Sequence, residues 1–145
     1  MTPVMQTITG NRGNCLSAVF ASLMELDLNE VPYFFENIKE DETDVKKALY
    51  IFNRDVKKFL YSKGYFFLKL EPSNIEEIIS QMRGFFIIGG KSPRGYNHAV
   101  IYTSEGLAHD PHPEGGGVIP ETIMILYPLF NYAQIKNQSD KPWED

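Results

Sequence analysis

Apolar side chains recur at helical spacing around the only cysteine of the chain, Cys15. Small residues lie between them, so residues 15 to about 26 are predicted to form a buried helix that packs closely against its neighbours. Gly13 and Asn14 precede this helix as start signals, and residues 1–12 are predicted to be irregular. The apolar face of the helix would hold Leu16, Val19, Phe20 and Leu23.

A second amphipathic pattern predicts a longer helix over residues 44–62, with lysines on its polar face. Gly64 is well placed to end it. A third, short helix is predicted after Ser73 or Asn74, both of which are good N-cap residues. The buried face of the second helix is predicted to hold Val45, Ala48, Leu49, Phe52, Val56, Phe59 and Leu60.

Apolar runs typical of strands lie mostly in the second half of the chain. Helices come first and closely spaced strands later, which predicts an α+β fold with an N-terminal helix packed on a C-terminal antiparallel β-sheet. One domain is expected over residues 1–136, followed by a polar tail at 137–145. The predicted strands cover residues 65–70, 85–88, 99–102, 107–110 and 123–127.

The amino-acid composition favours some classes of protein and argues against others. The 145 residues suit one domain, and 43% apolar and 13% aromatic residues are typical of a folded protein. A net charge of −5 argues against general nucleic-acid binding. A single cysteine cannot form an internal disulfide and favours a reducing compartment. We find no signal-like leader and no apolar window of membrane-spanning length, so a cytoplasmic protein is expected.

Cys15 is the first candidate for chemistry. In the first turn of a helix, unpaired backbone N–H groups and the helix dipole favour the thiolate, which is the nucleophilic form. The alternative is that Cys15 is a small buried apolar residue.

A nucleophilic cysteine needs a base, and the base needs a group that orients it. His98 begins a predicted strand, and Asp110 ends the next one. A three-residue loop at 104–106 would place Asp110 diagonally beside His98 on one face of a hairpin. Singly, His98 could satisfy a strand end and Asp110 could start a turn. This register pairs Tyr102 with Ala108, Val100 with Asp110 and His98 with His112.

Alternatively, His109, Asp110 and His112 could bind a metal ion, because imidazole and carboxylate groups are suitable ligands for zinc or manganese. Neighbouring strand residues such as 109 and 110 point to opposite faces, and we find no second group of ligands in the sequence. We therefore expect neither a metal nor another cofactor.

Five motifs together resemble the papain-like cysteine peptidase superfamily. Within it, the chain is most similar to small bacterial and bacteriophage proteins related to the C39 (bacteriocin-processing) peptidases, over roughly residues 5–127. The motifs are Gly-Asn-Cys-Leu-Ser-Ala-Val-Phe-Ala-Ser-Leu at 13–23, Val-Pro-Tyr-Phe at 31–34, Pro-Arg-Gly at 93–95, Asn-His-Ala-Val at 97–100 and His-Asp-Pro-His-Pro at 109–113.

The resemblance implies a papain-like fold and a role for each matching residue. Cys15 would be the nucleophile, His98 the general base and Asp110 the orienting acid. Gln6, nine positions before Cys15, is the candidate that would bind the oxyanion together with the backbone N–H of Cys15.

Basic residues near these motifs suggest what the site binds. Arg12, Lys91 and Arg94 would give the cleft a basic rim that attracts an anionic substrate, or they could pair with surface carboxylates such as Glu114. The other candidates for substrate contact are Asn14, Asn97 and His112.

Three function classes follow. The first is a Cys-His-Asp hydrolase that cleaves a peptide, isopeptide or other amide through a covalent thioester. The second is a phage counter-defence protein that hydrolyses or binds an anionic small molecule or signal nucleotide. The third is a non-catalytic interaction protein with the same fold. The triad favours the first, acting in the cytoplasm of a bacterial or phage-infected cell.

Overall fold

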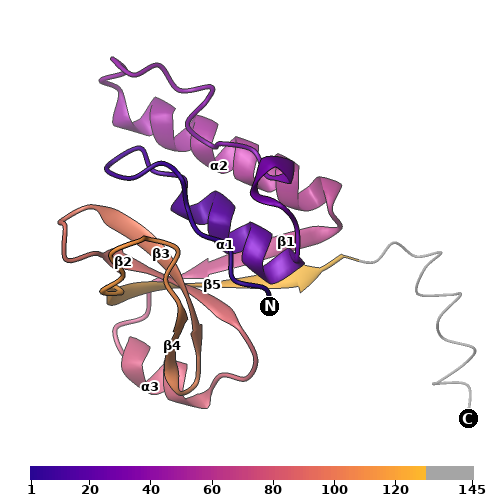
Figure 1. Cartoon of the computed structure of the whole chain (residues 1–145), viewed down its shortest axis with the longest axis vertical. Coiled ribbons are helices and arrows are strands. Elements are labelled where there is room, and N and C mark those ends of the chain that lie inside the picture. Colours follow the sequence, from indigo (N-terminus) through magenta and orange to yellow (C-terminus); the bar gives the residue numbers. More distant parts are fainter. Residues whose placement is uncertain (130–145) are drawn as a thin grey trace, which may run out of the picture.

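A computed structural model describes residues 1–129. The predicted polar tail at 137–145 and the last residues of the predicted domain lie outside this range. The described chain folds into a mixed α+β structure, as predicted (Figure 1). In chain order its elements are α1 (Cys15–Met24), the 3-10 helix η1 (Leu28–Glu30), α2 (Val45–Ser62), β1 (Tyr65–Leu70), α3 (Ile75–Gln81), β2 (Phe86–Lys91), β3 (Asn97–Thr103), β4 (Gly106–His109) and β5 (Ile119–Pro128).

The five strands form one sheet in the order β1-β5-β2-β3-β4, and every neighbouring pair is antiparallel. Helices α1 and α2 lie on one side of this sheet and α3 on the other (Figure 1). Successive strand residues alternate between these two sides. Ile87 and Ile101 therefore pack against α1, whereas Ile88 and Val100 pack toward α3.

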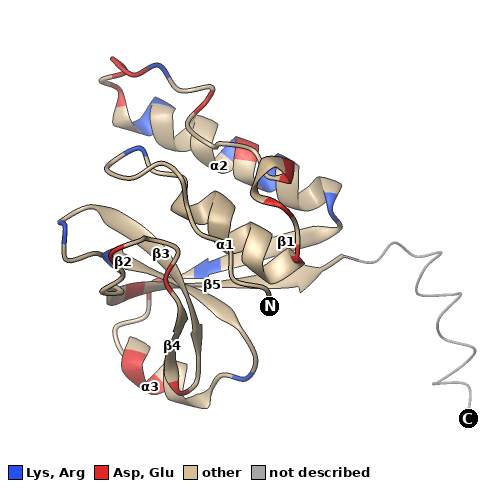
Figure 2. Cartoon of the chain, viewed as in Figure 1, with Lys and Arg blue, Asp and Glu red and all other residues tan. Residues whose placement is uncertain are grey.

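Helix α1 is the centre of the core. Val19, Phe20 and Ala21 are completely buried, and the helix carries no charged side chain (Figure 2). It ends at Met24 because Glu25 adopts a left-handed conformation with φ 55°. The buried helix that the apolar spacing predicted is confirmed. Along residues 1–129, no helix combines the length and the apolar character needed to cross a membrane.

Helix α2 departs from prediction at its N-terminal half. Its C-terminal half packs into the core through Val56, Phe59 and Leu60. Val45 and Leu49, predicted to be buried on the same face, are 69% and 56% exposed. The core lies beneath the C-terminal half of α2. Val45 and Leu49 lie over an open cleft and not over packed side chains, so they stay exposed.

Strand β2 extends three residues beyond its predicted end at position 88 and includes Gly89 and Gly90. The register against β5 shifts between these two glycines. A Cβ on Gly90 would collide with the backbone of Ile119, and one on Gly89 would lie 2.5 Å from Thr122 Oγ1. The prediction was wrong because these glycines continue the strand where β5 approaches closely. Strand β5 likewise begins at Ile119, four residues before its predicted start.

The predicted register of the β3–β4 hairpin was wrong at the turn. Thr103 pairs with Gly106 and Tyr102 with Leu107, so only two residues form the turn. A bulge between Ile101 and Tyr102 then shifts the register, so that Ile101 pairs with His109 as the prediction requires, and β4 ends there. Asp110 and His112 consequently lie in the loop after β4, unpaired with Val100 and His98.

Candidate active site

A cleft of about 640 Å³ lies between the helical layer and the sheet. Volumes of a few hundred Å³ are usual for sites that bind small molecules or short peptide segments. Cys15, the partly exposed first residue of α1, lies in this cleft together with His98 from β3. Gln6 and His112 also line it, so the structure gathers residues far apart in sequence around the cysteine.

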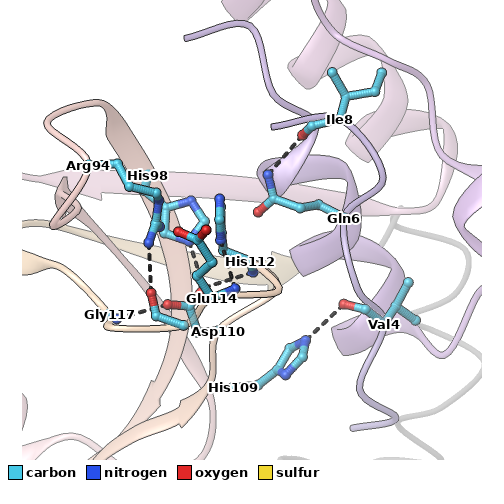
Figure 3. A network of polar contacts seen from close by, with 11 residues as sticks. Val4, Gln6, Ile8, Arg94, His98, His109, Asp110, His112, Glu114 and Gly117 are labelled. Carbon is cyan, nitrogen blue, oxygen red and sulfur yellow. Dashed lines mark hydrogen bonds and ion pairs between the residues drawn. The ribbon is translucent and has the colours of Figure 1, made fainter. Parts of the chain in front are cut away.

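His98 and Asp110 form a buried ion pair, although Asp110 lies in the loop after β4. The His98 Nε2–H group donates to Asp110 Oδ1 at 2.7 Å, and both side chains are almost fully buried. The backbone N–H of His112 donates to the same carboxylate oxygen at 2.9 Å, and that of Gly117 donates to Oδ2 at 2.8 Å. These three donors fix the carboxylate, and they leave His98 Nδ1 as the ring nitrogen available to another group (Figure 3).

The electrostatics of this pair favour its charged form. Burial alone would raise the pKa of Asp110, but the hydrogen bonds from His98, His112 and Gly117 lower it to about 2. Burial alone would lower the pKa of His98, but hydrogen bonding and negative charge from Asp110 and Cys15 raise it to about 9. With a pKa of about 9, His98 is mainly an imidazolium at neutral pH.

The glycine-rich loop that closes on Asp110 has a role that was not predicted from the sequence. Gly115, Gly116 and Gly117 all have positive φ, between 62° and 92°, and this run delivers the Gly117 N–H to the carboxylate. A Cβ on Gly116 would lie 2.8 Å from the Pro93 side chain. Three successive glycines were the available signal, because such a run permits consecutive left-handed conformations.

Gln6 reaches the site through the folded loop that precedes α1. Its backbone N–H donates to Pro111 O at 2.9 Å, which ties it to the segment after Asp110. Its Nε2 donates to Ile8 O at 2.8 Å, and the side chain is buried. A Cβ on Gly13 would lie 3.2 Å from this nitrogen. The amide nitrogen carries two hydrogens, of which Ile8 uses one (Figure 3).

Asn14 holds the same loop together. Its Oδ1 accepts from the backbone N–H groups of Thr7 and Ile8 at 3.0 and 2.9 Å, and its Nδ2 donates to Thr7 Oγ1. Its own N–H donates to Ile8 O. The amide predicted to contact substrate is thus engaged within the protein.

Replacing Asn14 with alanine is expected to lower the free energy of unfolding by about 1–2 kcal/mol, because two backbone donors lose their acceptor. Urea denaturation of wild-type and Asn14→Ala protein measures the difference. Asn11, which is exposed in the same loop, provides the control, and Asn11→Ala is expected to change stability by less than about 0.5 kcal/mol. Equal losses for both variants would contradict the assignment.

The two arginines predicted to form a basic rim bind backbone carbonyls. Arg12 Nη2 donates to Phe35 O and Ile38 O at 2.9 and 2.7 Å, and its guanidinium lies 5.1 Å from the centre of the Phe35 ring. Arg94 Nη1 donates to Gly115 O at 2.9 Å. Both residues line the cleft, and both also fix the loops around it.

Charges along the cleft are balanced. Within residues 1–129, it is lined by as many acidic as basic side chains, and both kinds occur in the loop before α2 (Figure 2). Lys91, the third residue of the predicted basic rim, does not line it. The basic side chains are Arg12, Lys39, Lys69 and Arg94, and the acidic ones are Glu40, Glu42, Glu71 and Glu121.

His112 and Asn97 also line the cleft, as expected of substrate-contact candidates. The backbone N–H of Glu114 donates to His112 Nδ1 at 3.0 Å, so the proton of neutral His112 resides on Nε2. Its ring meets that of His98 edge-on, with the centroids 6.0 Å apart. Asn97 is exposed at the start of β3.

His109 lies apart from this group. Its Nε2 bonds to Val4 O at 2.8 Å, which ties the N-terminal segment to β4 (Figure 3). In the described part of the chain, no three His, Cys, Asp or Glu side chains gather in a way that could hold a metal ion.

No family model, curated protein or solved structure matches this chain. The roles proposed below therefore follow from the geometry and chemistry of the residues themselves.

Proposed function

We propose that the chain is a cysteine hydrolase of the papain-like type, with Cys15 as nucleophile, His98 as acid and base, and Asp110 as the orienting carboxylate. The observation that carries this proposal is the position of His98. Its imidazole is held by Asp110 through Nε2, it lines the same cleft as Cys15, and Cys15 contributes to its raised pKa. A cysteine at a helix start, beside an imidazolium, is the environment that activates a thiol.

The reaction is an acyl transfer to Cys15. The Cys15 thiolate attacks the carbonyl carbon of an amide, and the carbonyl oxygen becomes an oxyanion. The backbone N–H of Cys15 and the second Nε2 hydrogen of Gln6 stabilise that oxyanion. The His98 imidazolium gives its Nδ1 proton to the leaving amine as the C–N bond breaks, which produces a thioester. Neutral His98 then takes a proton from water, whose oxygen attacks the thioester carbonyl carbon. The C–S bond breaks, a carboxylic acid is released, and Cys15 thiolate and His98 imidazolium are regenerated.

The first test is the reactivity of Cys15, because a single thiol makes the labelled site unambiguous. At pH 6.5 iodoacetamide is expected to alkylate the folded protein at least tenfold faster than it alkylates N-acetylcysteine. The reason is that an ordinary thiol is only about 1% thiolate at this pH. Intact-mass spectrometry over time gives both rates, and Cys15→Ala reports labelling at other groups. A folded protein that reacts more slowly than N-acetylcysteine from pH 6 to 9 would overturn the proposal.

The substrate is then sought with the same pair of proteins. Peptides and host lysate are incubated with wild-type and Cys15→Ala protein, and new termini are identified by mass spectrometry. Cleavage that requires Cys15, accompanied by a transient acyl adduct on the wild-type protein, is the expected result. Identical peptide patterns with both proteins would argue for a non-catalytic role.

Hydrolysis or binding of an anionic small molecule or signal nucleotide has less support. Both arginines expected to bind an anion donate to backbone carbonyls, and the cleft has no excess of basic side chains within the described residues. The geometry therefore favours an amide substrate over a phosphate-bearing one.

A further inference from the structure

The exposed half of α2 forms an apolar wall of the cleft. Val45, Ala48, Leu49 and Phe52 are spaced as one face of a helix, and all four line the same cleft as Cys15. We call these four residues the α2 wall. Such a face is normally buried against other side chains, so its exposure marks a surface suited to an apolar ligand.

The α2 wall is continuous with packed aromatic residues at its inner end. The rings of Phe35 and Phe52 lie 5.0 Å apart, and Phe52 contacts Phe34 of the core. Arg12, which binds Phe35 O and stacks on the Phe35 ring, fixes this end of the wall beside the loop that leads to Cys15. The wall is therefore anchored at its inner end and does not require closure of another segment.

The sheet side of the cleft is mixed. Lys69 and Glu71 from the β1 side and Glu121 and Thr122 from β5 supply its polar groups, and Ile87, Gly89, Ala99 and Met124 also line it. A ligand that fits can therefore present apolar groups to α2 and hydrogen-bonding groups to the polar residues of the sheet. A peptide segment meets both demands, because its side chain can be apolar while its backbone offers hydrogen-bonding groups.

We propose that the cleft selects peptide segments in which an apolar side chain packs on the α2 wall while the scissile carbonyl lies at Cys15. This inference rests on the proposed hydrolase function and names its substrate class. The preference comes from removing apolar surface from water on both partners, and one well-fitted aliphatic side chain gives discrimination of about tenfold or more.

The test uses tripeptides that carry a thiol-reactive vinyl sulfone at the C-terminus. Leucine is compared with glutamine at each position in turn, and the inactivation constant KI and the maximal rate kinact for Cys15 are measured by intact mass. At one position, the leucine probe is expected to have a KI about tenfold lower than its glutamine counterpart. Leu49→Gln is expected to remove that difference by raising KI, while kinact and the iodoacetamide rate stay unchanged.

Tyr50 supplies a matched control on the same helix. It is 68% exposed and does not line the cleft, so Tyr50→Gln is expected to leave KI unchanged. If Cys15 reacts rapidly with iodoacetamide but wild-type protein shows no leucine preference, or Leu49→Gln retains it, this inference is wrong and the hydrolase proposal stands. If Cys15 is no more reactive than N-acetylcysteine, both proposals fall.

Discussion

Replacing His98 with alanine is expected to slow the alkylation of Cys15 at pH 6.5 by about 100-fold. In the wild-type protein the pKa of His98 is raised to about 9, so the ring is an imidazolium at this pH and stabilises the adjacent thiolate. Without the imidazolium, Cys15 approaches an ordinary thiol, of which about 1% is ionised at pH 6.5. The second-order rate with iodoacetamide, measured by intact mass from pH 5 to 9, tests this expectation.

The pH profiles distinguish activation from a simple change in access. As pH falls from 8 to 6, the wild-type rate is expected to decrease less than the His98→Ala rate, because only the wild-type protein carries the His98 imidazolium. His109→Ala is the matched control, because His109 bonds to Val4 O away from the cleft, and its profile is expected to follow the wild type. Circular dichroism establishes that each variant is folded. Parallel profiles for wild-type and His98→Ala protein would show that His98 does not activate Cys15.

The positions of helices could be predicted because their signals are local. The apolar spacing around Val19 and Phe20 lies within the helix that it specifies, and the same is true of the amphipathic pattern of α2. What covers each helix is not a local property. The N-terminal half of α2 has the same apolar periodicity as its C-terminal half, yet Leu49 lines a cleft and Leu60 is buried. Periodicity defines a face, and only the tertiary fold decides whether that face is covered.

The His98–Asp110 pair was predicted with the right residues, and its geometry only in part. The expected hairpin brought Asp110 to His98 by strand pairing, and the bulge after Ile101 does restore the predicted register at His109, but β4 ends there. Asp110 lies in the loop that follows, where it accepts from His98 and from the backbone N–H of Gly117. A bulge and a loop closure depend on backbone contacts that leave little trace in side-chain alternation, so these were the least predictable features.

The hydrogen-bond partners of the two arginines could not be predicted for a similar reason. Sequence shows where positive charge lies, and it gives no sign of which carbonyl oxygens the folded backbone will present. Arg12 donates to Phe35 O among other carbonyl oxygens, and Arg94 donates to Gly115 O. Both arginines therefore hold the loops around the cleft in place. Their position near Cys15 was inferred correctly, while their present partners are backbone groups.

Replacing Asp110 with asparagine is expected to lower the free energy of unfolding by about 2–3 kcal/mol near pH 5.5, because the buried imidazolium loses a charged hydrogen-bond acceptor. The sign of the pH dependence follows from the two pKa values. The lowered pKa of Asp110, from 3.8 to about 2, contributes stability above pH 4 that is lost as pH falls through 2. The raised pKa of His98, from 6.5 to about 9, contributes stability that is complete below pH 6.5 and is lost as pH rises through 9.

The difference between wild-type and Asp110→Asn protein should therefore be largest between pH 4 and 6.5 and should shrink toward pH 9.5. Urea denaturation at pH 5.5, 7.5 and 9.5 measures it. Asp41→Asn, at an exposed loop position, is expected to change stability by less than about 0.5 kcal/mol at each pH. A loss for Asp110→Asn that is the same at pH 5.5 and 9.5 would contradict the charged pair. It would mean that Asp110 stabilises the fold only by accepting the backbone N–H groups of His112 and Gly117, because those donors do not titrate.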